Sequence, residues 1–318
     1  MIEIKNLTIQ FNRQPPVVED MSLTVPEGGR TIILGESGSG KSVTLAAILG
    51  ILPSDAAVRG SIKIGGTEVL GLRERELRKI RGKVIGYIPQ GSGNGMNPLM
   101  TVGEQVSEPL VEHSGLKKDE ALQKAKAWME RLGLTPADKL ARAYPHTLSG
   151  GMRQRAVIAM ALCCNPCLLL ADEPTTALDV TIQKQILNLF LELQESDRMS
   201  IMMVTHDIGV AAQVADQIAI MYGGIILECG ATRQVLETPA NPYTKALIAA
   251  LPKSGNRERL VAIEGQPPTI VHMPPGCPFS NRCAYATEAC RQSVPELKPI
   301  DEHHMTACHM NLVTSGGK

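Results

Sequence analysis

The order of an apolar run, a glycine-rich loop and a helix near the N-terminus constrains the fold of this chain most strongly. Residues 31–34 are Thr-Ile-Ile-Leu, residues 35–42 are Gly-Glu-Ser-Gly-Ser-Gly-Lys-Ser, and apolar residues then recur at helical spacing up to Gly50. The loop matches the pattern G-x-x-x-x-G-K-[ST], which binds phosphate groups between a strand and a helix. We therefore expect an α/β fold of the P-loop class.

The loop supplies the groups that a bound nucleotide requires. Its glycines permit a tight turn whose backbone N–H groups face phosphate oxygens, beside the positive N-terminal end of the helix. The lysine reaches the outer phosphates, and the last serine joins the shell of a Mg²⁺ ion. A chance glycine-rich turn is the alternative, and the flanking strand and helix argue against it. The loop residues expected to bind nucleotide are Gly35, Ser37, Gly38, Gly40, Lys41 and Ser42.

Four more apolar runs predict further buried strands, at residues 84–88, 168–171, 201–204 and 218–221. A helical pattern joins the second of these runs to the third, and such alternation indicates a mostly parallel core sheet. Gly65-Gly66 between two alternating segments signals a hairpin, and hence an antiparallel β lobe. Residues from about 94 to 162 lack such runs, so we expect an inserted helical subdomain there.

Polar residues follow two of the predicted strands directly. Asp172 comes at the end of the 168–171 run, on the side where ligands of open α/β sheets bind, and its carboxylate suits a Mg²⁺ ion. Glu173 is the better candidate to orient or deprotonate an attacking water. His206 follows the 201–204 run and would meet the same crevice. A solvated acidic turn and a structural histidine are the alternatives.

A second anion-binding helix start lies at residues 148–152, Leu-Ser-Gly-Gly-Met. Together with the phosphate loop and the acidic pair, this run resembles the signature sequence of the ATP-binding subunits of ABC transporters. The resemblance implies that two subunits bind head to tail, each closing its signature over the ATP held by the other. Met152 departs from the glutamine common in that family. The signature residues expected at that ATP are Ser149, Gly150 and Gly151.

The same resemblance assigns roles to residues that are unremarkable by themselves. Gln90 matches the Q-loop glutamine, which touches Mg²⁺ or water while its loop meets the membrane partner. Residues 176–179 resemble the D-loop, which ends here at Asp179 and reaches a second subunit in the family. Phe11 ends the first strand and is the candidate for stacking on adenine, with core packing as the alternative. A histidine at the position of His206 also occurs in the family.

Composition limits the partners of the chain. Lys and Arg total 32 and so do Asp and Glu, which gives no sign of the basic face of a nucleic-acid binder. The longest apolar runs are far shorter than the roughly 20 residues that span a bilayer. We therefore expect a peripheral protein at the cytoplasmic face of the inner or plasma membrane, with the membrane part supplied by partners.

The C-terminal part of the chain differs in composition from the rest. Ten of the 21 prolines and four of the eight cysteines lie in residues 236–318, so we expect a nucleotide-binding domain at 1–235 and an irregular accessory extension at 236–318. The spacing C-x5-C-x6-C-x17-C lacks the close cysteine pair of most zinc sites but is compatible with an iron–sulfur cluster. Zinc and free thiols stay open as alternatives. The four cysteines are Cys277, Cys283, Cys290 and Cys308.

The extension resembles that of ATPases from oligopeptide, dipeptide and nickel importers, some of which carry a [4Fe-4S] cluster on four such cysteines. The resemblance implies an ATP- and Mg²⁺-dependent ATPase that powers import of peptides, nickel or metal chelates. Its partners would be two membrane permease subunits, a second and different ATPase subunit and, indirectly, an extracytoplasmic binding protein. A soluble ABC ATPase of DNA repair or translation and an iron–sulfur redox sensor are the competing functions.

Overall fold

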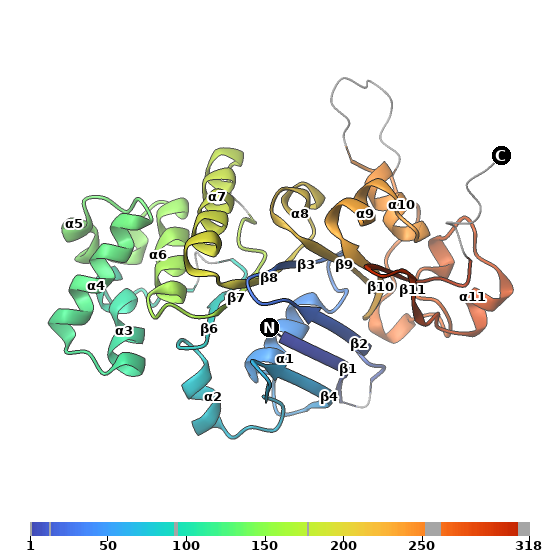
Figure 1. Cartoon of the computed structure of the whole chain (residues 1–318), viewed down its shortest axis with the longest axis horizontal. Coiled ribbons are helices and arrows are strands. Elements are labelled where there is room, and N and C mark those ends of the chain that lie inside the picture. Colours follow the sequence, from blue (N-terminus) through green and yellow to red (C-terminus); the bar gives the residue numbers. More distant parts are fainter. Residues whose placement is uncertain (1, 13, 92–94, 177, 252–261, 311–318) are drawn as a thin grey trace. The chain divides into compact units, whose positions relative to one another are not determined.

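The chain folds into two compact units, which are described separately here. The computed structural model describes residues 2–12, 14–91, 95–176, 178–251 and 262–310. The first unit comprises Val25–Arg30 and Gly71–Val204, and the second comprises Ile2–Thr24, Thr31–Leu70 and Thr205–Lys318. Figure 1 gives the element labels used below.

A parallel strand arrangement forms the core of the first unit. Strand β7 (Leu168–Asp172) pairs in parallel with β6 (Ile85–Ile88) and with β8 (Ser200–Thr205). Helix α7 (Val180–Asp197) is the crossover from β7 to β8, and it buries Ile186, Leu187, Phe190 and Leu193. All residues of β7 and β8 are buried, which explains why both strands are nearly continuous apolar runs in the sequence. The predicted strands and crossover helix are confirmed.

Helices account for the regular structure described between β6 and β7. Helices α3 and α4 pack against each other, and Figure 1 shows α3 to α6 gathered at one end of this unit. Thr101 caps α3 by accepting a hydrogen bond from the Glu104 backbone N–H, while the Glu104 carboxylate accepts from the Thr101 N–H. Among the described residues of the first unit, the α-helices are α2 (Glu74–Ile80), α3 (Val102–Ser114), α4 (Lys118–Arg131), α5 (Ala137–Ala141), α6 (Gly150–Leu162) and α7.

The second unit contains an antiparallel lobe. Strands β1 (Ile2–Phe11), β2 (Val18–Val25), β4 (Ala56–Ile64) and β5 (Thr67–Glu68) form a sheet in the order β2-β1-β4-β5. Gly65 and Gly66 make the predicted hairpin turn with φ of 56° and 84°, in the region where a side chain would be strained. The predicted antiparallel lobe is thereby confirmed.

The larger sheet of the second unit is built around β9 (Gln217–Tyr222). This strand pairs in parallel with β3 (Arg30–Leu34) and antiparallel with β10 (Ile225–Ala231). On the far side of β10, β12 (His304–Ala307) and β11 (Leu297–Asp301) continue the sheet as an antiparallel pair. The α-helices that the structure describes in this unit are α1 (Lys41–Leu49), α8 (Ile208–Val214), α9 (Thr232–Glu237), α10 (Pro242–Ala249) and α11 (Glu288–Gln292).

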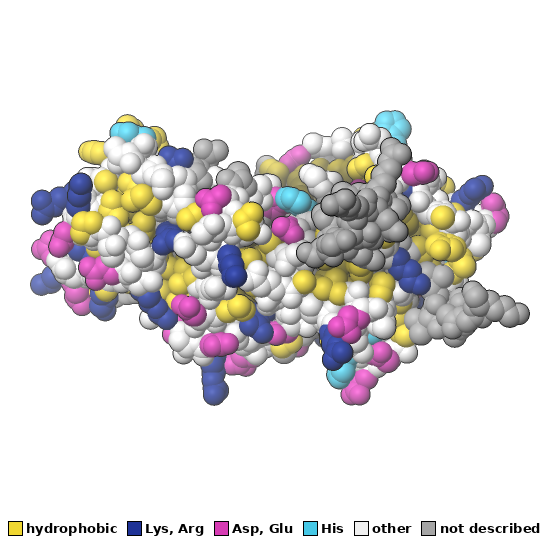
Figure 2. All heavy atoms as spheres, turned by 90° about the horizontal axis from the view of Figure 1, so that it is seen from above, with side chains coloured by type: hydrophobic (Ala, Val, Ile, Leu, Met, Phe, Trp, Pro, Cys, Tyr) yellow, Lys and Arg dark blue, Asp and Glu magenta, His cyan; other side chains and the backbone are white. Residues whose placement is uncertain are grey.

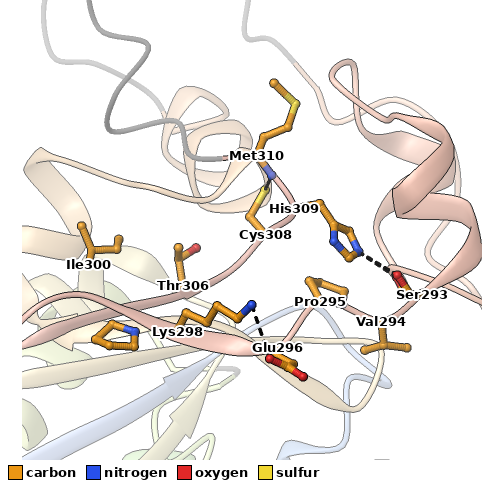
Figure 3. A pocket seen from close by; sticks show the side chains of 11 residues that line it. Ser293, Val294, Pro295, Glu296, Lys298, Ile300, Thr306, Cys308, His309 and Met310 are labelled. Carbon is orange, nitrogen blue, oxygen red and sulfur yellow. Dashed lines mark hydrogen bonds and ion pairs between the residues drawn. The ribbon is translucent and has the colours of Figure 1, made fainter.

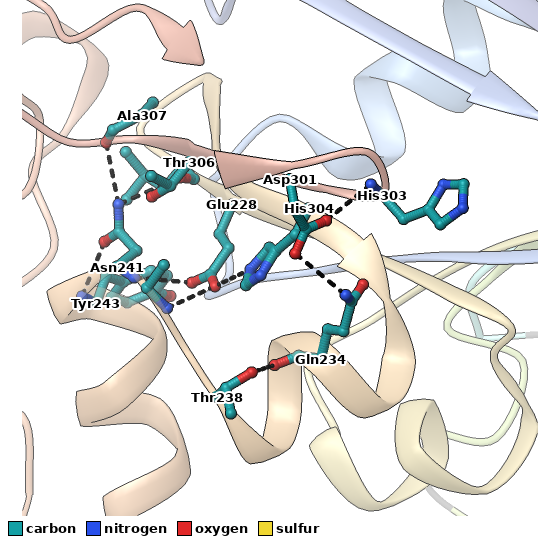
Figure 4. Close-up of polar contacts among 12 residues, drawn as sticks. Glu228, Gln234, Thr238, Asn241, Tyr243, Asp301, His303, His304, Thr306 and Ala307 are labelled. Atoms are coloured by element: carbon teal, nitrogen blue, oxygen red, sulfur yellow. Dashed lines mark hydrogen bonds and ion pairs between the residues drawn. The ribbon is translucent and has the colours of Figure 1, made fainter. Parts of the chain in front are cut away.

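The C-terminal region therefore has more regular structure than its proline content indicates. A buried carboxylate in β10, Glu228, links this strand to β12 and to the segment before α10 (Figure 4). It accepts hydrogen bonds from the backbone N–H groups of Ala240 and Asn241, at 2.7 and 3.0 Å, and pairs with His304 Nε2 at 2.7 Å. The Asn241 amide donates to the Leu227 and Ala307 carbonyls. Because these groups are buried, each would be costly to leave unpaired.

We predict that Glu228→Ala destabilises the second unit strongly. The change leaves two buried N–H groups and a buried imidazole without their acceptor, at a cost of about 3 kcal/mol or more. Differential scanning calorimetry should record a fall of roughly 6 °C or more in the transition midpoint. The control is Glu296→Ala, whose carboxylate is 81% exposed and pairs only at the surface. Equal shifts in the two variants would contradict the prediction.

Candidate nucleotide site

The phosphate loop lies against the neighbouring strand so closely that its first residue has room only for glycine. A Cβ atom on Gly35 would lie 2.1 Å from the carbonyl oxygen of Met221, near the end of β9. Gly40, directly before α1, has φ of 101° and would place a Cβ 2.8 Å from the Val17 carbonyl oxygen. The loop pattern read from the sequence thus corresponds to a backbone that other residues cannot adopt.

The lysine of the loop is buried within it. Lys41 Nζ donates to the carbonyl oxygens of Gly35 and Glu36, both at 2.8 Å, and lies 3.4 Å from Ser39 Oγ. Ser37, Gly38 and Ser42 are exposed. An anion entering this loop would therefore meet an ammonium group beside the N-terminal end of α1.

The structure places the segment that carries the predicted histidine beside the phosphate loop. The Gly35 N–H donates to the carbonyl of Thr205 at 3.3 Å, and His206 follows directly and is exposed. Asp207 then caps α8 by accepting from the Gly209 and Val210 N–H groups. Phe11, the candidate for adenine stacking, is half-buried at the end of β1.

In the first unit, two of the predicted site residues, Gln90 and Glu173, are in contact. Gln90 Nε2 donates to Glu173 Oε2 at 3.1 Å, and the Thr176 hydroxyl donates to the same oxygen at 2.9 Å. Asp172 is buried at the end of β7, whereas Glu173 turns away with φ of 44°. A positive φ in a residue with a side chain is strained, and such strain concentrates at functional sites. Sequence reasoning missed the contact that Thr176 makes with Glu173.

The Asp172 carboxylate affects the pKa of a tyrosine in the first unit. Burial, and secondarily the Asp172 carboxylate, raise the pKa of Tyr87 on β6 to about 12. The phenol therefore stays protonated even in mildly alkaline solution and adds no charge beside the carboxylate.

The signature run forms the expected helix start. Ser149 Oγ accepts from the Met152 N–H at 3.3 Å and caps α6, whose first residues are Gly150 and Gly151. The space around Gly150 is open, while a Cβ on Gly151 would touch Ile182 of α7 at 3.2 Å. Met152 uses its backbone in this cap, so the departure from glutamine leaves the cap intact.

The run that resembles the D-loop ends in another helix cap. Asp179 accepts from the Ile182 N–H at 2.9 Å and caps α7. Ala177, inside that run, lies outside the described residues, as do Ser92, Gly93 and Asn94 after Gln90.

The four C-terminal cysteines come together around one small hollow. All four line it, together with residues such as Asn241 and Phe279. Burial raises the pKa of Cys277 to about 11 and raises that of Cys283 and Cys308 as well. Within the part of the chain that the structure describes, no three His, Cys, Asp or Glu side chains are arranged to hold a metal ion.

Backbone and hydroxyl groups point at these sulfur atoms. The N–H groups two residues further on, of Phe279, Tyr285 and Met310, bond to the sulfurs of Cys277, Cys283 and Cys308 respectively. The Thr287 hydroxyl lies 3.4 Å from Cys290 Sγ. The three backbone N–H donors stabilise the thiolate forms of Cys277, Cys283 and Cys308 and so oppose the effect of burial.

A larger cavity of about 710 Å³ opens on another side of Cys308 (Figure 3). Residues before and within β11, among them Pro295 and Lys298, line it opposite Thr306 and Met310. His309 Nε2 contacts the Ser293 carbonyl oxygen at 2.9 Å across one end. Cys308 thus lines both the four-cysteine hollow and this larger cavity.

The surface agrees with the balanced composition. On the face shown in Figure 2, basic and acidic side chains are interspersed, and neither sign gathers into a broad patch. Among the described helices, none has the length and apolar character that crossing a bilayer requires.

Comparison with known families and proteins identifies this arrangement. The ABC transporter family matches residues 18–176, and the C-terminal region of oligopeptide/dipeptide transporters matches residues 227–290. The chain is 42% identical to the oligopeptide transport ATP-binding protein OppD of Haemophilus influenzae over 98% of this chain and 97% of the relative. It is 40% identical to the oligopeptide transport ATP-binding protein AppD of Bacillus subtilis, over 93% of this chain and 92% of the relative.

Solved structures show the same fold. The ATP-binding cassette MJ0796, a dimer bound to ADP and Pi, matches with a TM-score of 0.66 and 32% identity, over 73% of this chain and 99% of that one. The structure of cbiO1 from Clostridium perfringens, part of an ABC transporter complex, matches with a TM-score of 0.65 and 26% identity, over 74% and 90%. The chain therefore belongs to the ABC transporter family of ATP-binding proteins, and its C-terminal region is of the oligopeptide/dipeptide transporter type.

Proposed function

We propose that this ABC-type ATPase powers the import of peptides through separate membrane subunits. The observation that carries the proposal is the hydrogen bond between Gln90 and Glu173, because it joins the candidate water-orienting carboxylate to the loop that meets the membrane partner in the family. End-to-end similarity to oligopeptide transport proteins supports peptides as cargo over nickel or metal chelates.

In the proposed site, some residues neutralise the charge of the phosphates and others activate the attacking water. Lys41 and the loop N–H groups would bind the phosphates, and Ser42, Gln90 and Asp172 would hold Mg²⁺, which supplies charge stabilisation when bound. Glu173 would orient or deprotonate the attacking water, with His206 contacting the γ-phosphate. Thr176 and Gln90 bond to one oxygen of Glu173, so they fix the direction of its carboxylate.

The remaining candidates are proposed for contacts beyond the phosphates. Phe11 would stack on adenine. Ser149, Gly150 and Gly151 would close over the ATP of a second ATPase subunit, with Asp179 near that junction. An open helix start at Gly150, with room for an anion, supports this role.

We predict that Glu173→Gln retains ATP binding but lowers hydrolysis about 100-fold or more, because the amide accepts hydrogen bonds yet is a poor base. Steady-state phosphate release and equilibrium ATP binding measure the two effects. Size-exclusion chromatography of this chain together with the second ATPase chain, in ATP and Mg²⁺, should show more closed dimer for the variant than for the wild type.

The matched control is Glu195→Gln, on the exposed surface of α7 in the same unit. It should hydrolyse ATP at the wild-type rate. Unchanged turnover in Glu173→Gln would remove Glu173 from its proposed role.

We propose two membrane permease subunits and a second, different ATPase chain as direct partners, with an extracytoplasmic binding protein acting indirectly. The chain would then be peripheral, on the cytoplasmic face of the inner or plasma membrane. Its interspersed surface charges give no support to a nucleic-acid partner.

Affinity purification of the tagged chain from its own cells, with detergent-solubilised membranes, should recover permease subunits and a second ATPase identified by mass spectrometry. Recovery of ribosomes or DNA without integral membrane proteins would instead support the translation or repair function. Deletion of the gene should abolish growth on peptides as the sole source of a required amino acid.

We propose residues 1–235 as the nucleotide-binding domain, with its helical subdomain at about 94–162, and residues 236–318 as an accessory extension. Within the extension, we propose that Cys277, Cys283, Cys290 and Cys308 bind a [4Fe-4S] cluster. The four cysteines line one hollow, and backbone N–H groups donate hydrogen bonds to three of their sulfurs. Both features support a thiolate-bound cluster.

We predict that anaerobically purified protein contains about four iron atoms per chain and absorbs visible light as thiolate-bound clusters do. Cys290→Ser should lose most of this iron, whereas Cys167→Ser, which changes an exposed cysteine in the other unit, should keep it. Because burial raises the thiol pKa values, loading should release protons and weaken as the pH falls. Stoichiometric zinc without iron would refute the cluster.

A further inference from the structure

A buried arginine links the cysteine segment to the phosphate loop. The Arg282 side chain is 6% exposed, and its Nη1 lies 2.8 Å from Glu36 Oε2 and 3.0 Å from Tyr222 Oη. Its Nε donates to the Glu264 carbonyl at 3.0 Å, and its Nη2 donates to the Ile263 carbonyl at 3.4 Å. The guanidinium is thus held on several sides, in the planar donor geometry that suits arginine better than lysine.

Aromatic rings surround this ion pair. The ring of Tyr222 lies 4.5 Å from that of Tyr243 and 5.4 Å from that of Phe279, measured between centroids. The guanidinium carbon of Arg282 lies 5.8 Å from the Tyr222 centroid and 6.0 Å from that of Phe279. Because the side chain of Arg282 is 6% exposed and that of Glu36 is 25% exposed, their attraction is screened less than at an open surface.

Glu36 is the only acidic residue of the phosphate loop, residues 35–42. Its carbonyl oxygen accepts hydrogen bonds from Lys41 Nζ at 2.8 Å and from the Ser39 N–H at 3.3 Å. A shift of Glu36 would therefore move an acceptor of the phosphate-binding lysine. An unpaired Glu36 carboxylate would also repel the negative charges of a triphosphate.

The other end of this link is the four-cysteine hollow. Arg282 ends the 3₁₀ turn Ser280–Arg282, between Cys277 and Cys283. The Ser280 N–H donates to the Cys277 carbonyl at 2.9 Å, and Cys283 follows Arg282 directly. The cysteines on both sides of the turn line the hollow, so whatever they hold fixes the position of the turn.

We infer that Arg282 is a positioning residue for the phosphate loop: it neutralises and holds Glu36, and through it the four-cysteine segment tunes the affinity for ATP. The second part rests on the four-cysteine site proposed above. A filled site would hold the turn and keep Arg282 on Glu36. An empty site would loosen the turn, free the Glu36 carboxylate and weaken ATP binding.

The test is a set of ATP dissociation constants, measured by calorimetry on the full chain without Mg²⁺ so that no hydrolysis occurs. Arg282→Gln should bind ATP about tenfold more weakly than the wild type. Arg282→Lys should bind ATP with an affinity between those of Arg282→Gln and the wild type. Glu36→Gln in the Arg282→Gln background should recover most of the affinity, because it removes the unpaired charge. A merely structural role for Arg282 would not produce that recovery.

The matched control is Arg291→Gln. Arg291 also adjoins one of the four cysteines, Cys290, but its side chain is exposed. This variant should bind ATP as the wild type does. An Arg282→Gln affinity within twofold of the wild type would overturn the inference, and so would a failure of Glu36→Gln to recover binding.

The link to the cysteines is tested by comparing iron-loaded protein with the same preparation stripped by a chelator. Stripping should weaken ATP binding several-fold in the wild type and have no further effect in Arg282→Gln. Equal affinities of loaded and stripped wild type would overturn the link. A protein that contains no iron would refute the cluster and the link together, while the variant series would still decide the role of Arg282.

Discussion

The close approach of the phosphate loop to β9 is the constraint on which the second unit depends. No side chain fits between Gly35 and the Met221 carbonyl, so the loop takes its position from the end of that strand. The same strand pairs with β3 on one side and with β10 on the other. Its last residue, Tyr222, packs against the Tyr243 ring and accepts a hydrogen bond from Arg282. One strand thus supports both the nucleotide loop and the packing of the C-terminal region.

Local patterns made much of this fold predictable. The strands β3, β6, β7, β8 and β9 are short and buried on both faces, so apolar runs reveal them without knowledge of their partners. The phosphate loop and the Gly65-Gly66 turn are equally visible, because only glycine tolerates their backbone. Strands β11 and β12 could not be predicted in this way, because each is short and mixes polar with apolar residues, and the pairing of β12 with β10 is supported by a carboxylate 76 positions away in the chain.

The candidate site was predictable as a set of residues but not as a set of contacts. Glu173 was predicted from the strand that precedes it and Gln90 from the family resemblance, and 83 positions separate them in the chain. Arg282 and Glu36 are 246 positions apart, and neither matches a pattern that implies the other. Such pairs depend on tertiary packing, which no local spacing encodes. Thr176 is intermediate, since a hydroxyl three residues after Glu173 is within reach of its carboxylate in a tight turn.

The buried hydrogen bonds of Asn241 make the C-terminal strands inseparable from the rest of the second unit. This one amide bonds to β10 through Leu227 and to β12 through Ala307, while its oxygen caps α10 at Tyr243. A chain truncated before residue 297 would therefore uncover the edge of β10 and unpaired polar groups at once. The cysteine-bearing region behaves as an internal part of its host rather than as an attachable module, and transplanting it to another ATPase would require the receiving β10 to be redesigned with it.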